Sequence, residues 1–307
     1  MSELSTFEPP PFDPAAPLVG SGNLRRRQFI SRFVQGGATA CAMAAVAVLA
    51  IVIFAVVQRG ARSLSIGFLV HDPPQVMSGG GGGIASAIVG TSLIVACATV
   101  IAAPIGVLCA LYLVEFAGGR SRAGQLLQLA LDMLQGLPSI VVGLVILGLL
   151  VVPEHADSGF AASVALSIIM LPLIARTAQE VLLTVPQGLR DASDSLGVDR
   201  WRAVLTVIIP SALSGIVTGT ILAIARAAGE TAPVLLVDGT FTNRTTVEVF
   251  GHAVPNLSVL IYELFDQPSA TSVQRAWGAS LVLLALILIA NIGARLMLAR
   301  NRRRMGL

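Results

Sequence analysis

The sequence predicts an all-α membrane protein with six transmembrane helices, and two observations carry this prediction. First, 55% of the 307 residues are hydrophobic and 12% are charged, whereas soluble domains carry about 25% charged residues. The mean hydropathy is +0.83. Second, the apolar residues fall into six long runs separated by polar segments, and a helix that crosses a bilayer needs about 20 apolar residues. The chain is therefore expected to cross a membrane repeatedly.

The N-terminal part of the chain is predicted to be a disordered cytoplasmic tail followed by the first transmembrane helix. Residues 1–23 are rich in proline and lack the apolar residues of a core. The first helix is predicted at 24–58, where a basic flank precedes an apolar run over 34–57. The flank resembles a twin-arginine export signal, but a signal peptide has an apolar run of about 7–15 residues and a small-residue cleavage site. An uncleaved span is therefore favoured over a cleaved signal.

The other five spans are predicted within a core at 84–300, which follows an outer loop at 59–83. They lie at 84–114, 126–152, 160–175, 204–237 and 276–298. Prolines interrupt four of the spans, which is tolerated only where neighbouring helices satisfy the freed carbonyl groups, so a packed bundle is expected. Asp132 and Gln135 are interpreted as polar residues at the start of the third span. A basic cytoplasmic tail at 301–307 ends the chain.

A longer segment at about 238–275 is predicted to lie on the outer side of the membrane. Its apolar residues are interleaved with Glu248, His252 and Glu263, a pattern typical of an amphipathic stretch on the membrane surface. A cap that packs on its own bundle fits the same pattern equally well.

The arginines predict the orientation of the chain. With the N-terminus in the cytoplasm, fifteen of the twenty arginines lie on the inner side, and an excess of basic residues marks cytoplasmic segments. The fifteen are Arg25, Arg26, Arg27, Arg32, Arg120, Arg122, Arg176, Arg190, Arg200, Arg202, Arg295, Arg300, Arg302, Arg303 and Arg304. Both termini are therefore predicted to be cytoplasmic, in a protein of the cell membrane.

Composition also excludes several classes of chemistry. The chain contains no lysine, which excludes Schiff-base catalysis and a phosphate-binding loop with its lysine. The glycine run at 79–83 is interpreted as a flexible entry to a helix. The three cysteines lie in apolar runs and the three histidines are scattered, so no metal site is predicted. No catalytic residue and no cofactor are expected, and the protein is not predicted to be an enzyme.

The polar segment at about 186–203 is the longest interruption in the middle of the apolar core. It reads as a short helix, a stop at Gly197 and a second helix, because glycine readily adopts the positive φ that ends a helix. Apolar residues alternate with charged ones along it, which suits docking into the groove of a partner. A solvated loop lying against its own bundle is about equally compatible with this amphipathic pattern.

Arg226 and Glu230 are the charged pair of the fifth apolar run. An arginine at hydrocarbon depth costs about 2.5–3.5 kcal/mol or more, and a glutamate four residues later lies on the same helical face. The guanidinium presents a planar set of donors that fits an oxyanion bidentately. The run over 204–237 is 34 residues long, so it must bend, tilt or leave the membrane. An ion pair that serves packing alone is the alternative to a role in transport.

The spacing in the polar segment resembles a known signature. Asp191-Ala192-Ser193, then Gly197, then Val207-x-Ile209-Pro210 is similar to the E-A-A-x3-G-x9-I-x-L-P signature of permeases of ABC importers. Aspartate stands here for the usual glutamate, serine for the second alanine, and valine and isoleucine for isoleucine and leucine. The run Arg226-x-x-Gly229-Glu230-Thr231-Ala232-Pro233 further resembles the PstA-type permeases of phosphate-specific ABC importers. The resemblance covers about residues 60–300.

The resemblance implies a MetI-like permease bundle, which forms half of the translocation pathway for inorganic phosphate. It implies that the loop at 189–210 docks on an ATPase subunit and that ATP hydrolysis occurs in that partner. The coupling residues would be Arg190, Asp191, Ala192, Ser193, Leu196, Gly197, Trp201 and Pro210. The substrate pathway would involve Arg226, Glu230, Thr231 and Arg176; for Arg176, an anion contact at the exit side is favoured by the resemblance, with a basic anchor at the membrane surface as the alternative.

The same resemblance implies a set of partners and leaves two rival functions. The implied partners are a PstC-type permease, two ATPase subunits, an extracytoplasmic phosphate-binding protein and membrane lipid, without nucleic acid. One rival is a permease for another oxyanion, such as phosphonate, sulfate or molybdate. The other is a self-sufficient secondary transporter, which would show paired broken helices or acidic residues at the membrane midplane, and the sequence suggests neither.

Overall fold

The computed structural model describes residues 24–73, 82–117, 121–239 and 248–305, and every regular element in these ranges is a helix. The all-α prediction is therefore confirmed for the described part of the chain. The chain divides into two compact units, Met1–Phe54 and Ala55–Leu307. The predicted tail at 1–23 and most of the glycine run at 79–83 lie outside the described residues.

The first unit contains most of helix α1 (Leu24–Gly60), which is 37 residues long. At a rise of 1.5 Å per residue it measures roughly 55 Å, more than the ~30 Å of a hydrocarbon core. The helix therefore includes the basic flank as well as the apolar run.

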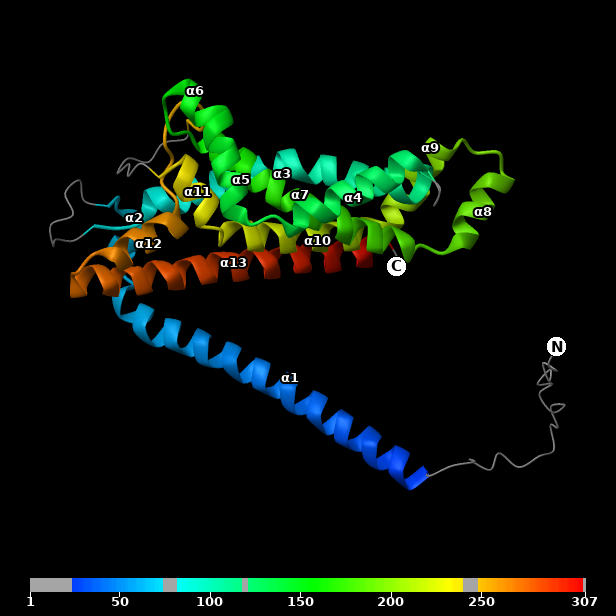
Figure 1. The fold of residues 1–307 in the computed structure, drawn as a ribbon, viewed down its shortest axis with the longest axis horizontal. Coiled ribbons are helices and arrows are strands. Elements are labelled where there is room, and N and C mark those ends of the chain that lie inside the picture. The colour runs from blue at the N-terminus through cyan, green and yellow to red at the C-terminus, as the bar shows by residue number, and fades with distance from the viewer. Residues whose placement is uncertain (1–23, 74–81, 118–120, 240–247, 306–307) are drawn as a thin grey trace, which may run out of the picture. The chain divides into compact units, whose positions relative to one another are not determined.

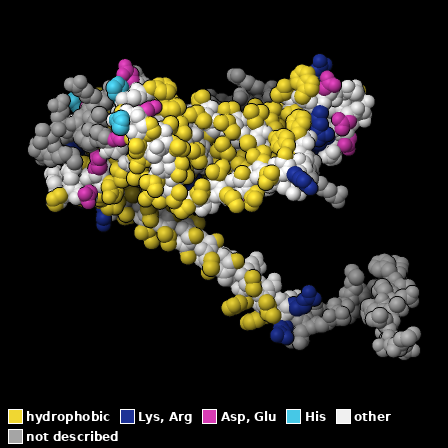
Figure 2. Space-filling view, turned by 45° about the horizontal axis from the view of Figure 1, so that its top comes forward, with side chains coloured by type: hydrophobic (Ala, Val, Ile, Leu, Met, Phe, Trp, Pro, Cys, Tyr) yellow, Lys and Arg dark blue, Asp and Glu magenta, His cyan; other side chains and the backbone are white. Residues whose placement is uncertain are grey.

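The second unit is a bundle of helices (Figure 1). Figure 2 shows hydrophobic side chains along the length of this bundle and charged ones gathered toward its two ends. Its α-helices are α2 (Ile66–Val70), α3 (Ala85–Leu111), α4 (Arg122–Gly136), α5 (Ser139–Ile146), α6 (Val152–Glu154), α7 (Gly159–Leu183), α8 (Gln187–Ser195), α9 (Arg200–Ala203), α10 (Ile209–Ala228), α11 (Ala232–Val237), α12 (Leu257–Asp266) and α13 (Ala270–Met305). Three π-helical turns, at Tyr112–Phe116, Leu147–Val151 and Val204–Ile208, and a 3-10 turn at Ala61–Ser63 complete the set.

Helices α3, α7 and α10 form the centre of the bundle, with α7 packed along both of the others. Ile94, Leu166, Met170 and Ile174 are fully buried between them. Small residues allow the close approach: a Cβ atom at Gly219 of α10 would collide with the side chain of Thr177 on α7. Because α7 runs to Leu183, it is longer than the predicted span at 160–175.

The third predicted span, 126–152, is sharply bent in the structure. Helix α4 and the helical segment from Ser139 to Glu154 meet at an angle of 101°. Pro138 causes the break because it has no N–H to donate and disfavours helical backbone at the preceding residue, and Leu137 is extended, with φ −69° and ψ 133°. The described residues contain five helices long and apolar enough to span a membrane, or six if the bent pair counts as one.

The fifth predicted span, 204–237, is also interrupted. Helix α10 ends at Ala228, and α11 begins at Ala232 with Pro233 in its first turn. Proline is favoured at that position, where no N–H is needed. Glu230 therefore lies in a break between two helices, within a run that is too long to cross the membrane as one straight helix.

Part of the segment predicted at 238–275 forms a cap on the bundle. Helix α12 packs against α13 and α3 and buries Leu257, Leu260 and Leu264. Asn256 caps its N-terminus, with Oδ1 accepting from the backbone N–H of Ser258 at 2.8 Å. The hydroxyl of Thr91 on α3 accepts from the N–H of Leu257, also at 2.8 Å. Helix α12 therefore fits the interpretation as a cap packed on its own bundle better than the interpretation as an amphipathic stretch on the membrane surface.

Asp238 is buried at the C-terminal end of helix α11, and its environment leads us to expect a pH-dependent stability. Its side chain is buried, Oδ1 accepts from the N–H of Val254 at 2.8 Å, and Oδ2 has no partner among the described groups. Burial, with the nearby charge of Asp157 adding, raises the pKa of Asp238 to about 8, although the Val254 hydrogen bond opposes the shift. The folded protein therefore holds a proton that the unfolded chain releases near pH 4, so this group's contribution to stability falls as pH rises from about 4 to about 8.

Replacing Asp238 by asparagine is expected to remove this contribution, because the amide is neutral at every pH and still accepts from Val254. In detergent, the midpoint of thermal unfolding of the wild type should fall between pH 5 and pH 8.5 by more than that of Asp238→Asn. The exposed Asp266→Asn variant is the control and should behave like the wild type. An identical pH profile for wild type and Asp238→Asn would contradict the interpretation.

Candidate functional site

The polar loop forms the helix–stop–helix predicted from its spacing, at one end of the bundle (Figure 1). Helix α8 ends at Ser195, and Gly197 has a positive φ of 70°. The N–H of Val198 donates to the carbonyl of Ser193 at 3.1 Å, which closes the helix end in the way typical of a glycine stop. Pro186 and Asp199 directly precede α8 and α9, and their non-helical ψ angles of 134° and 138° mark the two helix starts.

Two apolar side chains of the loop point away from the bundle. Leu196 is 81% exposed and Trp201 is 55% exposed. By contrast, Ser193 is buried and its hydroxyl donates to the carbonyl of Leu189 at 2.9 Å. The loop therefore has one side fixed to its own helices and another that offers apolar groups to a partner.

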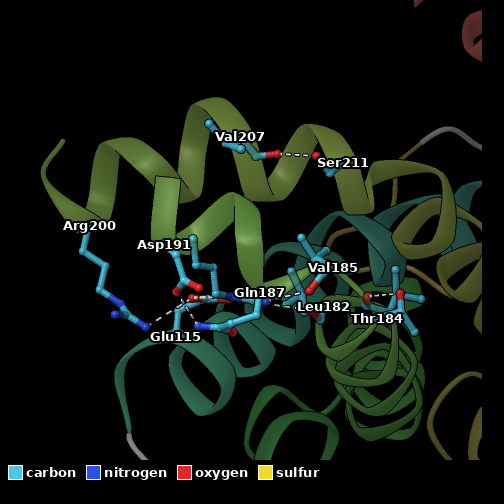
Figure 3. A network of polar contacts seen from close by, with 11 residues as sticks. Glu115, Leu182, Thr184, Val185, Gln187, Asp191, Arg200, Val207 and Ser211 are labelled. Atoms are coloured by element: carbon cyan, nitrogen blue, oxygen red, sulfur yellow. Dashed lines mark hydrogen bonds and ion pairs between the residues drawn. The ribbon is translucent and has the colours of Figure 1, made fainter. Parts of the chain in front are cut away.

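A buried glutamate that the sequence analysis did not single out lies beneath this loop. Glu115 belongs to the π-helical turn after α3, and its side chain is 1% exposed. Oε1 lies 2.8 Å from Nη2 of Arg190 on α8. Oε2 lies 3.4 Å from Nη2 of Arg200 on α9 (Figure 3). A buried carboxylate needs such partners, because an unpaired charge inside a protein is very costly.

The guanidinium of Arg190 also satisfies the end of α7. Nη1 donates to the carbonyl of Val185 at 2.7 Å, and Nη2 donates to the carbonyl of Leu182 at 2.9 Å. Cations are favourable at a helix C-terminus, where the last carbonyls have no partner within the helix. One side chain of α8 thus joins the ends of α3 and α7. We call Glu115, Arg190 and Arg200 the charge clamp.

Sequence reasoning missed Glu115 because it follows directly on the apolar run that was predicted to end at 114. The available signal was an acidic residue at the end of an apolar run, just before the arginines at 120 and 122. Which arginine it would meet could not be inferred, since Arg190 and Arg200 are 75 and 85 residues away in the chain.

The structure brings Arg226, Glu230 and Thr231 together at the break between α10 and α11. Nε of Arg226 lies 3.7 Å from Oε1 of Glu230, and the two side chains are 65% and 19% exposed. Helix α10 ends between Arg226 and Glu230, but the N–H of Glu230 still donates to the carbonyl of Ala227 at 3.1 Å. This hydrogen bond continues the helical turn and keeps the two side chains on the same face. The hydroxyl oxygen of Ser258 on α12 lies 3.1 Å from the carbonyl oxygen of Glu230.

Arg226 lies on an exposed stripe of α10 that is unusually polar for an apolar helix. The stripe consists of Ser211, Thr218, Leu222 and Arg226, with Gly229 just past the helix end, all exposed. Spacings of seven, four, four and three residues place them on one face. Because a guanidinium is costly against lipid, this face suits a water-filled pathway or contact with another protein better than contact with lipid.

The structure does not bring Arg176 to this group. Arg176, on α7, pairs instead with Asp132 on α4, and its Nη1 donates to Oε1 of Gln179 at 3.3 Å. Asp132 is therefore more than a polar residue at a helix start, because it holds the α4–α7 contact by an ion pair. The sequence could not reveal this pair, since 44 residues separate the two side chains.

Comparisons with known proteins agree with this architecture. Residues 102–306 match the family described as binding-protein-dependent transport system inner membrane component. The chain is 37% identical over 229 residues to the phosphate transport system permease protein PstA 1 of Mycobacterium tuberculosis, covering 74% of this chain and 73% of that protein. It is 34% identical over 251 residues to the phosphate transport system permease protein PstA of Yersinia pestis, covering 82% and 84%.

A solved structure shares the fold. The chain is similar to a chain of the MetNI methionine ABC transporter in an inward facing conformation, with a TM-score of 0.56 and 20% identity. The match covers 71% of this chain and 94% of that one. The predicted MetI-like bundle is therefore confirmed as a fold.

Proposed function

The chain belongs to the family of binding-protein-dependent transport system inner membrane components, and we propose that it is the permease subunit of an ATP-driven importer of inorganic phosphate. The observation that carries the choice of substrate is the exposed guanidinium of Arg226 beside Glu230, at a helix break. The names of the relatives, which are phosphate transport permeases, support the same substrate.

The Arg226–Glu230 pair suits transient binding of an oxyanion. A guanidinium offers two parallel N–H groups to phosphate and stays charged at physiological pH. At 3.7 Å, the contact with Glu230 is longer than a charge-assisted hydrogen bond, so the donors of Arg226 remain available to an incoming anion. Thr231 follows directly and adds a hydroxyl donor. Arg176, paired with Asp132, would act at a later point of the pathway on the cytoplasmic side.

Other subunits would complete the pathway. A PstC-type permease would cover the polar stripe of α10, because one chain with one such arginine provides half of a gate. Two ATPase subunits would hydrolyse ATP, one of them docked on α8 and α9. An extracytoplasmic phosphate-binding protein would meet the outer segment at 238–275. Both termini would lie in the cytoplasm, as the distribution of arginines predicts.

The coupling role of the loop rests on its exposed apolar residues and its rigid turn. Leu196 and Trp201 offer the buried anchors that a partner's groove requires. Asp191 and Ala192 lie on the same short helix, and Pro210 follows the π-helical turn through which α9 continues into α10. A displacement of the docked loop would therefore be transmitted to α10 and to Arg226.

Replacing Gly197 by valine is expected to uncouple ATP hydrolysis from phosphate uptake. No atom crowds the position, so the cost is the backbone penalty of a positive φ, about 1–2 kcal/mol for a residue with a side chain. Uptake per ATP hydrolysed should fall about 5- to 30-fold, the factor that corresponds to this energy. Gly197→Asn is the control, since asparagine tolerates this conformation, and should stay close to wild type. A Gly197→Val transporter with normal coupling would show that the turn is not required.

The proposed assembly is tested by affinity purification of the tagged chain from detergent-solubilised membranes. An ATPase subunit and a second, different permease should co-elute in stable proportion. Purification of the chain alone, or as a homo-oligomer that transports without an ATPase, would contradict the proposal and favour a self-sufficient transporter.

A further inference from the structure

Helix α8 is attached to α3 and α7 through polar contacts of the charge clamp. The backbone neighbours of α8 are chiefly α9 and the π-helical turn at Val204–Ile208. Its link to α3 is the ion pair between Arg190 and Glu115, and its link to the end of α7 is the pair of hydrogen bonds from Arg190. A movement of α8 can therefore reach α3 by way of Glu115.

Helix α3 is itself held at its other end, by Thr91. The Thr91 side chain is buried, its hydroxyl donates to the carbonyl of Ala87, and it accepts from the N–H of Leu257 at the start of α12. Between Thr91 and Glu115 the chain advances 24 residues, about 36 Å of helix at 1.5 Å per residue. This stretch packs along α7, so it is supported as a stiff element.

The outer end of this route reaches the candidate substrate site. Ser258 follows Leu257, and its hydroxyl oxygen lies 3.1 Å from the backbone carbonyl oxygen of Glu230 and 2.5 Å from Oδ1 of Asn256. The carboxylate of Glu230 is the partner of Arg226. A continuous chain of contacts therefore runs from α8 through Glu115, along α3 to Thr91, and through Leu257 and Ser258 to Glu230.

We propose that α3 carries the movement of α8 to the substrate site at Arg226 and Glu230, with Glu115 and Thr91 as the two positioning residues of this route. This inference rests on the proposed function, in which α8 docks on an ATPase. It adds a second route to the direct one from α9 into α10, and it assigns a transport role to two residues that are buried within this chain. Both routes meet at the Arg226–Glu230 pair, one from each side of the helix break.

The alternative is that both residues serve the stability of the fold alone. The two roles differ in what they change: a stability role alters the amount of assembled transporter, whereas transmission alters phosphate uptake per ATP hydrolysed by the assembled transporter. The ratio of uptake to hydrolysis, measured on purified complex in proteoliposomes, separates them.

The experiment compares conservative and disruptive variants at both positions. Glu115→Gln removes the charge and Glu115→Asp keeps it; Thr91→Val removes the hydroxyl and Thr91→Ser keeps it. The ratio of uptake to hydrolysis should fall about tenfold in Glu115→Gln and about threefold in Thr91→Val, the factors that correspond to losing a charge-assisted and a neutral hydrogen bond. The Asp and Ser variants should recover most of the wild-type ratio.

Two matched controls lie nearby. Thr99 is on the same helix, but its hydroxyl donates to the carbonyl of Val95 within α3, so Thr99→Val should keep the wild-type ratio. Glu180 is exposed on α7 and pairs with no arginine in the described part of the chain, so Glu180→Gln should do the same.

A wild-type ratio in Glu115→Gln and in Thr91→Val would overturn the proposal. If Glu115→Gln does not assemble, Thr91→Val decides, because it exchanges groups of nearly equal size at the far end of the route. The wild-type arm tests the proposed function separately: a complex that hydrolyses ATP without taking up phosphate would contradict that function, whereas normal wild-type uptake with unchanged variant ratios would contradict the transmission by α3.

Discussion

A transporter with Arg226 replaced by glutamine is expected to assemble normally and to take up phosphate at least about a hundredfold more slowly than the wild type. Glutamine retains one donor group but loses the positive charge and the paired N–H groups. Two charge-assisted hydrogen bonds contribute about 1.5–3 kcal/mol each, and every 1.4 kcal/mol corresponds to a factor of ten. Because the Arg226 side chain is 65% exposed in the isolated chain, folding should not depend on it.

The measurement is ATP-driven uptake of radiolabelled phosphate by reconstituted complex. Arg226→Lys should be intermediate, since lysine keeps the charge without the planar arrangement of donors. Arg202→Gln is the control for loss of an exposed arginine; the Arg202 side chain is 63% exposed on α9, and its Nε lies 3.8 Å from Oδ2 of Asp199. Uptake at the wild-type rate in Arg226→Gln would remove Arg226 from the pathway.

Replacement of Arg190 by glutamine is expected to destabilise the polar loop that contains α8 and α9. The expected cost is about 3–5 kcal/mol, which is typical of removing one partner from a buried ion pair. Glu115 would keep one partner, Arg200, at 3.4 Å, and that side chain is 52% exposed. The carbonyls of Leu182 and Val185 would also lose their donor. The ATPase should then be lost during purification, and trypsin should cut at Arg200 and Arg202 sooner than in the wild type.

A double variant tests whether the loss of the Arg190–Glu115 ion pair is the cause. Adding Glu115→Gln to Arg190→Gln removes the carboxylate charge that Arg190 no longer compensates, so the double variant should resist trypsin better than Arg190→Gln alone. Double-mutant cycles of this kind isolate the coupling between two residues. If Arg190→Gln retains the ATPase and the wild-type digestion pattern, the charge clamp does not fix the loop.

Local patterns of the sequence predicted the parts of the site that lie close together in the chain. Gly197 marked the stop between α8 and α9, because a glycine after a short amphipathic run favours a positive φ. The spacing of four residues brought Glu230 to Arg226 even though the helix ends between them. The apolar runs identified the helices of the bundle, since their length reflects the thickness of a bilayer.

The contacts between distant segments could not be predicted in this way. Glu115 has two arginine partners, and Asp132 pairs with Arg176, through packing that brings together residues at least 44 positions apart. The two interrupted spans had a visible cause, Pro138 and Pro233, but prolines also occur within intact helices of this bundle, such as Pro104 of α3 and Pro172 of α7. Whether a proline bends or ends a helix depends on neighbours that satisfy the freed groups.

We propose that this chain conducts inorganic phosphate as part of an ATP-driven complex. The most direct test is uptake of radiolabelled phosphate into proteoliposomes that contain the purified complex and its binding protein, with ATP on the side of the ATPase. We predict saturable uptake that requires ATP, is competed by unlabelled phosphate and is unaffected by excess sulfate, molybdate or phosphonate. Uptake of sulfate, molybdate or phosphonate in place of phosphate would contradict the assignment of the substrate, and phosphate uptake without ATP would contradict the assignment to an ABC importer.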